Sequence, residues 1–260
     1  MAKNKVRADE LVHAKGFCES RTRAQALILA GRVRFRKSPE DRWETVAKAG
    51  QSLPDDVEFE VDDPNRQDVG RGAQKLRGAL DHWRDLDVKG AWALDIGAST
   101  GGFTQVLLER GAERVLALDV GRHQLHERLR ADPRVISVEE QHVLRIEPPF
   151  WEERVGRSPP FGVIVTDVSF ISATKLVGVV ADWLAPGAPW ILLVKPQFEL
   201  EARKVPHGIV RTEEHRQEAL AKVRGAVEAD GRLVWDAIIE SPIQGGDGNV
   251  EYLARIRRKA

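Results

Sequence analysis

The spacing of apolar residues divides the chain into two regions. In the first sixty residues, apolar positions recur at helical intervals and then alternate with arginines, as in a half-buried strand. Ser20 or Thr22 is well placed to cap the second helix. The pattern predicts helices over 6–15 and 21–31, a strand over 32–36 and another from Val57.

The second region alternates amphipathic stretches with nearly continuous apolar runs that end in a polar residue, such as WALDI, VLALDV, GVIVTDV and WILLVK. Parallel strands covered by helices on both faces have this pattern. It predicts an α/β fold with a doubly wound, Rossmann-like sheet, closed by an antiparallel hairpin across QGGDGN. The expected helices span 72–86, 101–110, 172–184 and 212–229, and the expected strands span 91–96, 114–119, a segment near 135, 162–167, 189–194 and the two hairpin strands.

A polar stretch, DDPNRQDVG over 62–70, contains Pro and Gly and no apolar period. It is typical of a linker between domains. We therefore expect a small α+β domain over 1–61 and a larger α/β domain over 71–260.

Composition narrows the class of protein. The chain has 260 residues, 42% of them apolar, but no apolar run of the ~18 residues that a membrane span needs and no apolar leader. We expect a cytoplasmic protein with no membrane partner. The single cysteine, Cys18, excludes an internal disulfide, a thiolate zinc cage and an iron–sulfur cluster, and we expect no metal. Net charge is zero, yet residues 1–37 carry ten Lys or Arg against three acids.

The segment ALDIGASTGGFT runs from a predicted strand through a Gly-rich turn into a predicted helix, where a ligand can approach the backbone. Its spacing is G-x-x-x-G-G, and Asp95 before the turn would repel a pyrophosphate but attract a cationic amino-acid group. This favours S-adenosylmethionine over a dinucleotide. Asp119 ends the next strand, where a carboxylate binds the ribose hydroxyls of an adenosine.

Asp167 and Lys195 end two further strands, so both are expected at the edge of the sheet that binds ligands. Methyl transfer to a hydroxyl needs a base, and a lysine serves when burial and a second ammonium lower its pKa. Lys75 can supply that ammonium and Glu251 can orient the pair. TDVSF lacks the Asn/Asp-Pro-Pro-aromatic signature of amino-group methylation, which leaves oxygen as the remaining common target.

The predicted small domain has a basic face without an aromatic platform for stacking bases. Phosphate contacts to a structured RNA fit this composition best. The candidate RNA-binding residues are Arg7, Lys15, Arg21, Arg23, Arg32, Arg34 and Arg36.

With these residues assembled, the chain resembles the TlyA family, in which an S4-like RNA-binding domain precedes an FtsJ-like ribose methyltransferase domain. The resemblance covers nearly the whole chain through RADELVHAKGFCESRTRAQALILAGRV, RGAQKLRGAL, ALDIGASTGGFT, ALDVGRHQL, TDVSFIS, LVKPQFE and GNVEYL. Ala73 stands where the family usually has a second glycine, and His142 where Asn or Asp is common.

The resemblance implies cytidine 2′-O-methylation of ribosomal RNA, and it brings the older label of haemolysin. It assigns the catalytic tetrad to Lys75, Asp167, Lys195 and Glu251, with Lys195 as the base. The implied cofactor-binding residues are Asp95, Gly97, Ala98, Ser99, Gly101, Phe103, Asp119, Val120, His142 and Asp167.

Other functions stay open at this point. A membrane-active haemolysin needs an insertion element, and the predicted helices are all committed to the two domains. A non-catalytic RNA-binding protein would keep the fold without activity. An enzyme acting on a base or on transfer RNA would use the same basic face. We expect ribosomal RNA or ribosomal subunits as the partner and favour a monomer.

Overall fold

The computed structural model describes residues 5–18, 20–38, 40–63 and 68–260, and it forms two compact units, Met1–Gln67 and Asp68–Ala260. We call them the small unit and the large unit. Residues 64–67 of the predicted linker lie outside the described residues. The described parts of that stretch are each attached to their own unit: Asp62 donates its backbone N–H to Arg32, and Val69 donates to the side chain of Gln105.

The small unit packs two helices against short antiparallel strands. Strand β2 lies between β3 and β5, while β1 pairs with β4. Ser20 caps the second helix by accepting the N–H of Arg23 at 3.1 Å. The elements are β1 (Lys5–Arg7), α1 (Ala8–Ala14), α2 (Arg21–Leu29), β2 (Val33–Arg36), β3 (Glu44–Thr45), β4 (Ser52–Pro54) and β5 (Glu58–Val61).

Asp9 is a fully buried carboxylate at the start of α1. It accepts hydrogen bonds from Arg7, Arg21 and Gln25, so it ties the entry of α1 to α2. The bond from Arg7 is the largest of the effects that hold the pKa of Asp9 far below its usual range.

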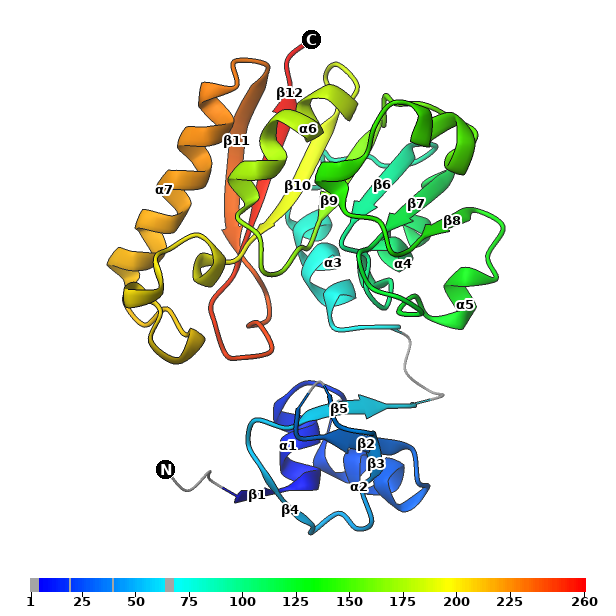
Figure 1. Ribbon diagram of the computed structural model, residues 1–260, viewed down its shortest axis with the longest axis vertical. Helices are drawn as coiled ribbons and strands as arrows, with labels where there is room; N and C mark the ends of the chain where they lie inside the picture. The colour runs from blue at the N-terminus through cyan, green and yellow to red at the C-terminus, as the bar shows by residue number, and fades with distance from the viewer. Residues whose placement is uncertain (1–4, 19, 39, 64–67) are drawn as a thin grey trace. The chain divides into compact units, whose positions relative to one another are not determined.

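The large unit is built on a seven-stranded sheet in the order β11-β12-β10-β9-β6-β7-β8, with helices on both faces (Figure 1). Strand β12 runs antiparallel to both neighbours, which confirms the predicted closing hairpin. The elements are α3 (Gly72–His82), β6 (Trp92–Ile96), α4 (Gly102–Glu109), β7 (Arg114–Leu118), α5 (Glu127–Arg130), β8 (Val135–Val138), η1 (Val143–Arg145), η2 (Trp151–Val155), β9 (Val163–Thr166), η3 (Ala173–Leu176), α6 (Val177–Trp183), β10 (Pro189–Val194), η4 (Pro196–Phe198), η5 (Ala202–Lys204), η6 (Pro206–Gly208), α7 (Glu213–Ala229), β11 (Leu233–Glu240) and β12 (Tyr252–Arg258).

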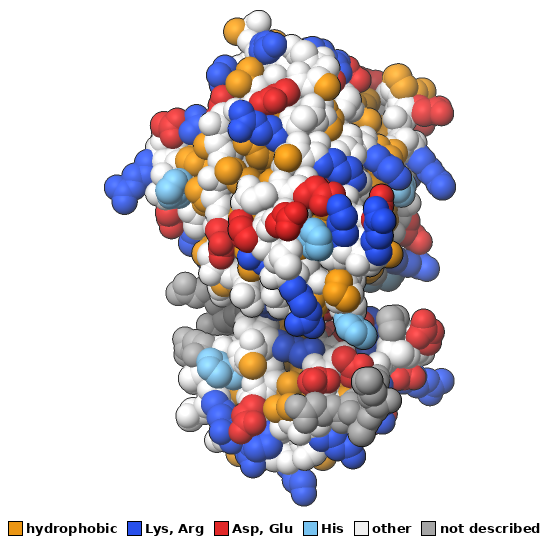
Figure 2. Space-filling model, turned by 90° about the vertical axis from the view of Figure 1, so that its left-hand side faces the viewer, with side chains coloured by type: hydrophobic (Ala, Val, Ile, Leu, Met, Phe, Trp, Pro, Cys, Tyr) orange, Lys and Arg blue, Asp and Glu red, His pale blue; other side chains and the backbone are white. Residues whose placement is uncertain are grey.

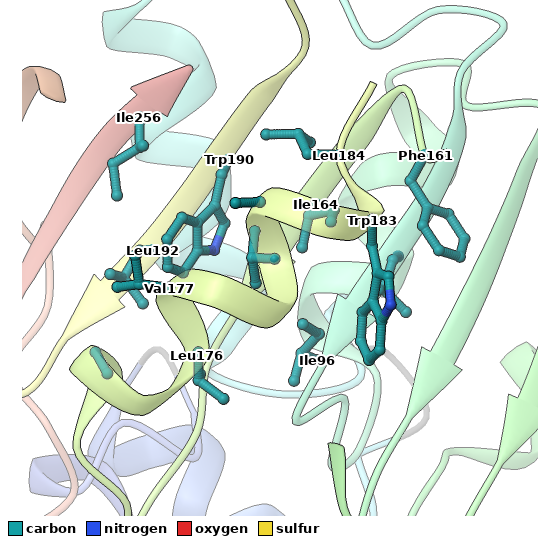
Figure 3. Close-up of a cluster of buried hydrophobic side chains, with 14 of the residues drawn as sticks. Ile96, Phe161, Ile164, Leu176, Val177, Trp183, Leu184, Trp190, Leu192 and Ile256 are labelled. Carbon is teal, nitrogen blue, oxygen red and sulfur yellow. The ribbon is translucent and has the colours of Figure 1, made fainter. Parts of the chain in front are cut away.

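Alternate residues of the sheet supply two separate hydrophobic cores. Leu94 and Leu192 face the core that α6 and α7 cover, whereas Ala93 and Ile191 face the core under α3 and α4. Figure 3 shows the first core, with Trp190 and Leu192 from β10 packed beside the α6 helix. Burial on both faces explains why these strands are almost entirely apolar in sequence.

Several predicted elements differ from the structure in their bounds, among them three helices. The helix expected over 6–15 begins at Ala8 because residues 5–7 pair with β4, a contact that local periodicity does not reveal. The helix expected over 172–184 is η3 followed by α6. Helix α3 ends at His82 rather than near residue 86. Within the described residues, no helix combines the length and the apolar character needed to cross a bilayer.

Candidate active site

The turn between β6 and α4 leaves backbone exposed at the carboxyl edge of the sheet. Gly97 has a φ of +83°, and a Cβ there would lie 2.4 Å from the carbonyl oxygen of Asp167. The turn is held against β7, because Gly97 and Ala98 both donate their N–H groups to the carbonyl of Leu118. A side chain is therefore excluded where the turn meets the loop after β9.

Asp95 lies beneath this turn with no solvent exposure. One carboxyl oxygen accepts the hydroxyl of Thr104 at 2.7 Å, and the other has no hydrogen-bond partner among the described residues. Burial raises the pKa of Asp95 to about 7, and the charge of Asp167 adds to the rise. Asp95 is therefore partly protonated near neutral pH.

Asp119 joins the turn after β6 to the loop after β7. Its two carboxyl oxygens accept the backbone N–H groups of Ser99 at 2.8 Å and Gly121 at 2.6 Å. Each oxygen keeps further lone pairs, so Asp119 can still accept hydroxyl donors from outside. Next to it, Val120 is 63% exposed, which leaves a bare apolar surface at the edge of the sheet.

The remaining predicted cofactor residues are placed around this edge. His142 accepts the N–H of Leu144 through its Nδ1 atom and begins the short helix η1. Phe103 is buried against Gly72 at the start of α3. Gly101, with a φ of +97°, ends the turn before α4.

Lys195 and Asp167 form an ion pair where β10 and β9 end. The Lys195 Nζ lies 2.7 Å from an Asp167 oxygen, with 11% and 21% of the two side chains exposed. Nζ also donates to the Ser169 hydroxyl at 2.9 Å. The pair is shielded by the protein but open enough for a substrate to reach it.

Lys75 and Glu251 form a second ion pair, which is almost entirely buried. Nζ of Lys75 on α3 donates to Glu251, the residue just before β12, at 2.6 Å. Val194 pairs with Tyr252 in the antiparallel register, so Lys195 and Glu251 follow on adjacent strands at the same level. The four residues of the predicted tetrad therefore form two lysine–carboxylate pairs at one edge of the sheet.

The expected effect of Lys75 on Lys195 needs revision in this arrangement. The ammonium of Lys75 is compensated by its own buried carboxylate, so it is not an uncompensated positive charge beside Lys195. A further cation, Arg71, lies near Glu251 and donates to the carbonyl of Gln244. Burial lowers the pKa of Arg71, and Glu251 opposes that shift.

Sequence reasoning missed the residues that shape the loops around Lys195. Glu199 is buried and accepts the Ser172 hydroxyl at 2.5 Å and the Ala173 N–H at 2.7 Å, which ties the loop after β9 to the loop after β10. Phe170 has a φ of +65° and is 92% exposed. Its ring lies 5.2 Å from that of Phe198. The available signal in the sequence was the aromatic residue Phe170 within TDVSF.

All seven candidate RNA-binding residues of the small unit have partners inside that unit. The ion pairs of Arg32 with Asp62 and of Arg34 with Glu60 are exposed on both sides. The others are Arg7 and Arg21 with Asp9, Arg23 with Asp63, Arg36 with Glu58, and Lys15 with the carbonyl of Val57. The six arginines among them are therefore paired with acids of the same unit, whereas Lys15 is bonded to a carbonyl.

Comparison with known proteins identifies the family. The model of the FtsJ-like methyltransferases matches residues 69–258, which is the whole large unit apart from its ends. The chain belongs to the FtsJ-like methyltransferase family. It is therefore a methyltransferase with the Rossmann-like fold, and S-adenosylmethionine is its cofactor.

Two curated relatives and one solved structure match almost the full chain. "Hemolysin A" of Brachyspira hyodysenteriae is 39% identical over 96% of this chain and 98% of its own length. "16S/23S rRNA (cytidine-2'-O)-methyltransferase TlyA" of Mycobacterium tuberculosis is 38% identical over 97% and 90%. A structure described as a candidate hemolysin from Streptococcus thermophilus has a TM-score of 0.73 and 35% identity over 99% and 90%. These matches confirm the resemblance to the TlyA group of this methyltransferase family.

The geometry of the edge fits an adenosine cofactor that carries an amino acid. Gly97 lets the turn pack closely against the backbone of Asp167, Asp119 keeps acceptor capacity for ribose hydroxyls, and Val120 offers an apolar surface for a base. The unpartnered buried oxygen of Asp95 lies under the same turn. Among the described residues, no cluster of acids, histidines or cysteines is arranged to hold a metal.

Gly97→Ala tests the close approach at the turn. The added Cβ collides with the backbone of Asp167, so we expect at least a tenfold loss of S-adenosylmethionine affinity, measured by calorimetry. Gly156→Ala is the matched control, since Gly156 also has a positive φ of +69° but no atom within 4 Å of the added Cβ. Equal affinity in both variants would contradict the proposed position of the cofactor.

Asp95→Asn tests the proton stored beneath the turn. The native pKa of about 7 exceeds the unfolded value of about 4, so the native state binds the extra proton between these values. The contribution of Asp95 to stability is complete below pH ~4 and is lost as pH rises towards 7. The difference in unfolding free energy between wild type and Asp95→Asn should fall over this window. Asp247→Asn, at an exposed position, is the matched control.

Proposed function

We propose that this chain transfers the methyl group of S-adenosylmethionine to the 2′-hydroxyl of a cytidine ribose in ribosomal RNA, with Lys195 as the base. The Lys195–Asp167 pair carries this proposal, because it places a shielded lysine beside the Gly97 turn, at the carboxyl edge where open α/β sheets bind ligands. The names of the full-length relatives support the substrate, since the Mycobacterium protein is named for cytidine-2'-O methylation of 16S and 23S rRNA.

The reaction needs one proton to be removed. Bound S-adenosylmethionine supplies a methyl group activated by its sulfonium, and the attacking ribose oxygen must lose its hydrogen as the new bond forms. The neutral amine of Lys195 accepts that proton at Nζ and becomes an ammonium. Asp167, 2.7 Å from Nζ, stabilises the ammonium and holds it in place.

Lys75 and Glu251 act as the second half of the tetrad in this proposal. Glu251 is held by Lys75 at 2.6 Å and lies at the level of Lys195 on the adjacent strand. A carboxylate in that position orients the lysine and the substrate hydroxyl. Lys75 pairs with Glu251 in this nearly buried position, so neither side chain is buried without an oppositely charged partner.

The proposed cofactor site follows the turns after β6, β7 and β8. Gly97, Ala98, Ser99 and Gly101 offer backbone to the amino-acid part, and Asp119 accepts the ribose hydroxyls. Val120 and His142 lie where the adenine is expected. Asp95, Phe103 and Asp167 support these turns from below and from the side.

We infer that the small unit is an S4-like RNA-binding domain, with residues 62–70 as its link to the catalytic domain at 71–260. Figure 2 shows acidic side chains among the basic ones on the visible surface of this unit. Exposed ion pairs stabilise a protein by about 0–1 kcal/mol, so an arginine can leave its acid for an RNA phosphate at little cost. Arg32 and Arg34 are the arginines with the most exposed partners.

The aromatic pair Phe170 and Phe198 favours RNA as the substrate of the large unit. Phe170 is almost fully exposed and lies against Phe198, whose ring centroid is 6.0 Å from Lys195 Nζ, so it presents a face on which an unstacked base can lie. The other exposed large apolar residues, Leu29, Val120, Leu144 and Ile238, belong to different elements, so no observation favours a lytic function.

A ribosomal substrate implies a cytosolic protein. One chain carries both lysine–carboxylate ion pairs of the site, so a monomer suffices for the reaction.

Lys195→Ala tests the proposed base. We expect methyl transfer to purified ribosomal subunits and free rRNA to fall roughly 100-fold or more, because a positioned base contributes about 10²–10⁴ to such rates. Affinity for S-adenosylmethionine, measured separately, should change little, which distinguishes lost chemistry from lost binding. Lys204→Ala, a lysine paired with Glu218 on the surface, is the matched control. Full transfer by Lys195→Ala would contradict the proposal.

Arg34→Gln and Glu60→Gln test the small unit as a matched pair. Losing Arg34 should weaken RNA binding several-fold and reduce the slope of log affinity against log salt by about one, as for one lost phosphate contact. Losing its partner Glu60 releases Arg34 and should strengthen binding instead. Identical affinities of both variants over a salt series would argue against RNA binding by this face.

A further inference from the structure

Ser169 contacts the proposed base, although neither the tetrad nor the cofactor site includes it. Its hydroxyl accepts a hydrogen bond from Lys195 Nζ at 2.9 Å, while Asp167 lies 2.7 Å from the same nitrogen. The Ser169 side chain is exposed, and the structure gives it no packing role. Within the part of the chain that the structure describes, its hydroxyl bonds only to the proposed base.

The two contacts fill two of the three tetrahedral positions of Nζ. A neutral amine has two hydrogens and one lone pair in these positions. With Asp167 and Ser169 each accepting one hydrogen, the lone pair must occupy the third position. Among the described residues, no other hydrogen-bond acceptor is bonded to Nζ, and the centroid of the Phe198 ring lies 6.0 Å from it.

The loop that carries Ser169 is held firmly on both sides. Asp167 donates its backbone N–H to Ile96 of β6. Three residues after Ser169, Ser172 and Ala173 are bound by the buried carboxylate of Glu199. The backbone that carries Ser169 is therefore restrained by both neighbouring loops, and the bond to Lys195 holds the hydroxyl itself.

We propose that Ser169 is a positioning residue for Lys195, which directs the lone pair of the neutral amine towards the ribose hydroxyl. This inference rests on the proposed function. In the reaction, the hydroxyl proton moves to the third position of Nζ, and Ser169 and Asp167 keep the two hydrogens already present. The resulting ammonium donates more strongly to both acceptors than the amine did, so the contact with Ser169 strengthens as the proton arrives.

The other charged groups around Lys195 stay constant when Ser169 is changed. Asp167 faces it from the end of β9, and Glu251 lies level with it on the strand beside β10. Lys75 on α3 is bound to Glu251, and Arg71 lies near the same carboxylate. Asp95 lies beneath the turn and interacts with Asp167. Any change in the pH dependence of Ser169→Ala therefore reports on the lost hydroxyl.

The test is single-turnover methyl transfer to rRNA with saturating S-adenosylmethionine across the pH range in which activity rises. We compare wild type, Ser169→Ala, Ser169→Thr and Lys195→Ala, with Ser158→Ala as an exposed serine control that bonds only Glu152. Ser169→Ala should lower the rate plateau about tenfold and move the acid limb to lower pH, because the ammonium loses more than the amine. Ser169→Thr restores the hydroxyl and should recover both.

The outcomes separate this inference from the function on which it rests. Superposed profiles for wild type and Ser169→Ala would overturn the role of Ser169, and so would a lower plateau without movement of the limb or without recovery by threonine. If Lys195→Ala keeps full activity, the proposed base fails, and the role of Ser169 fails with it. Cofactor affinity and circular dichroism of each variant verify that the protein is folded and loaded.

Discussion

The buried ion pair between Lys75 and Glu251 joins helix α3 to the start of strand β12, 176 residues later in the sequence. Removing one partner of such a pair leaves an uncompensated buried charge, which typically costs about 3–5 kcal/mol. The pair therefore fixes β12 against the helix that precedes the sheet. Because β12 runs beside β10, the same contact determines what lies next to Lys195. The site is a consequence of how the last strand is anchored.

The charged groups at this edge of the sheet also differ in their exposure to solvent. Glu251 and Lys75 are nearly buried and compensate each other, whereas Lys195 and Asp167 remain partly accessible. Asp95 is buried without a cation, and burial raises its pKa to about 7. Groups of the same chemical types thus have different roles because their environments differ. Only the accessible pair can meet a substrate hydroxyl, which is why the proposed proton transfer involves Lys195.

Much of the fold was predictable because burial leaves a direct imprint on sequence. Strands covered on both faces must be apolar along their whole length, so β6, β7, β9 and β10 were found with bounds correct to a residue or two. Strand β1 was missed because it exists only through pairing with β4, and η3 was merged with α6 because both are amphipathic.

The ends of parallel strands share one edge, so the closeness of Asp167 and Lys195 followed from topology. The pairing of the four tetrad residues into two lysine–carboxylate ion pairs depends on loop geometry, and so do the contacts of Ser169 and Glu199. The spacing of apolar residues carries no information on that geometry. Sequence spacing also did not reveal that the arginines of β2 face acids on the adjacent β5.

The position of the transferred methyl group tests the central claim most directly. Ribosomal RNA methylated with labelled S-adenosylmethionine can be digested to nucleosides and resolved by mass spectrometry, which distinguishes a methyl group on the ribose from one on the base. The account predicts label on the ribose of cytidine, because the lysine–carboxylate pairs activate a hydroxyl. Label on a base would contradict it, since Lys195 and Asp167 would then serve a different reaction.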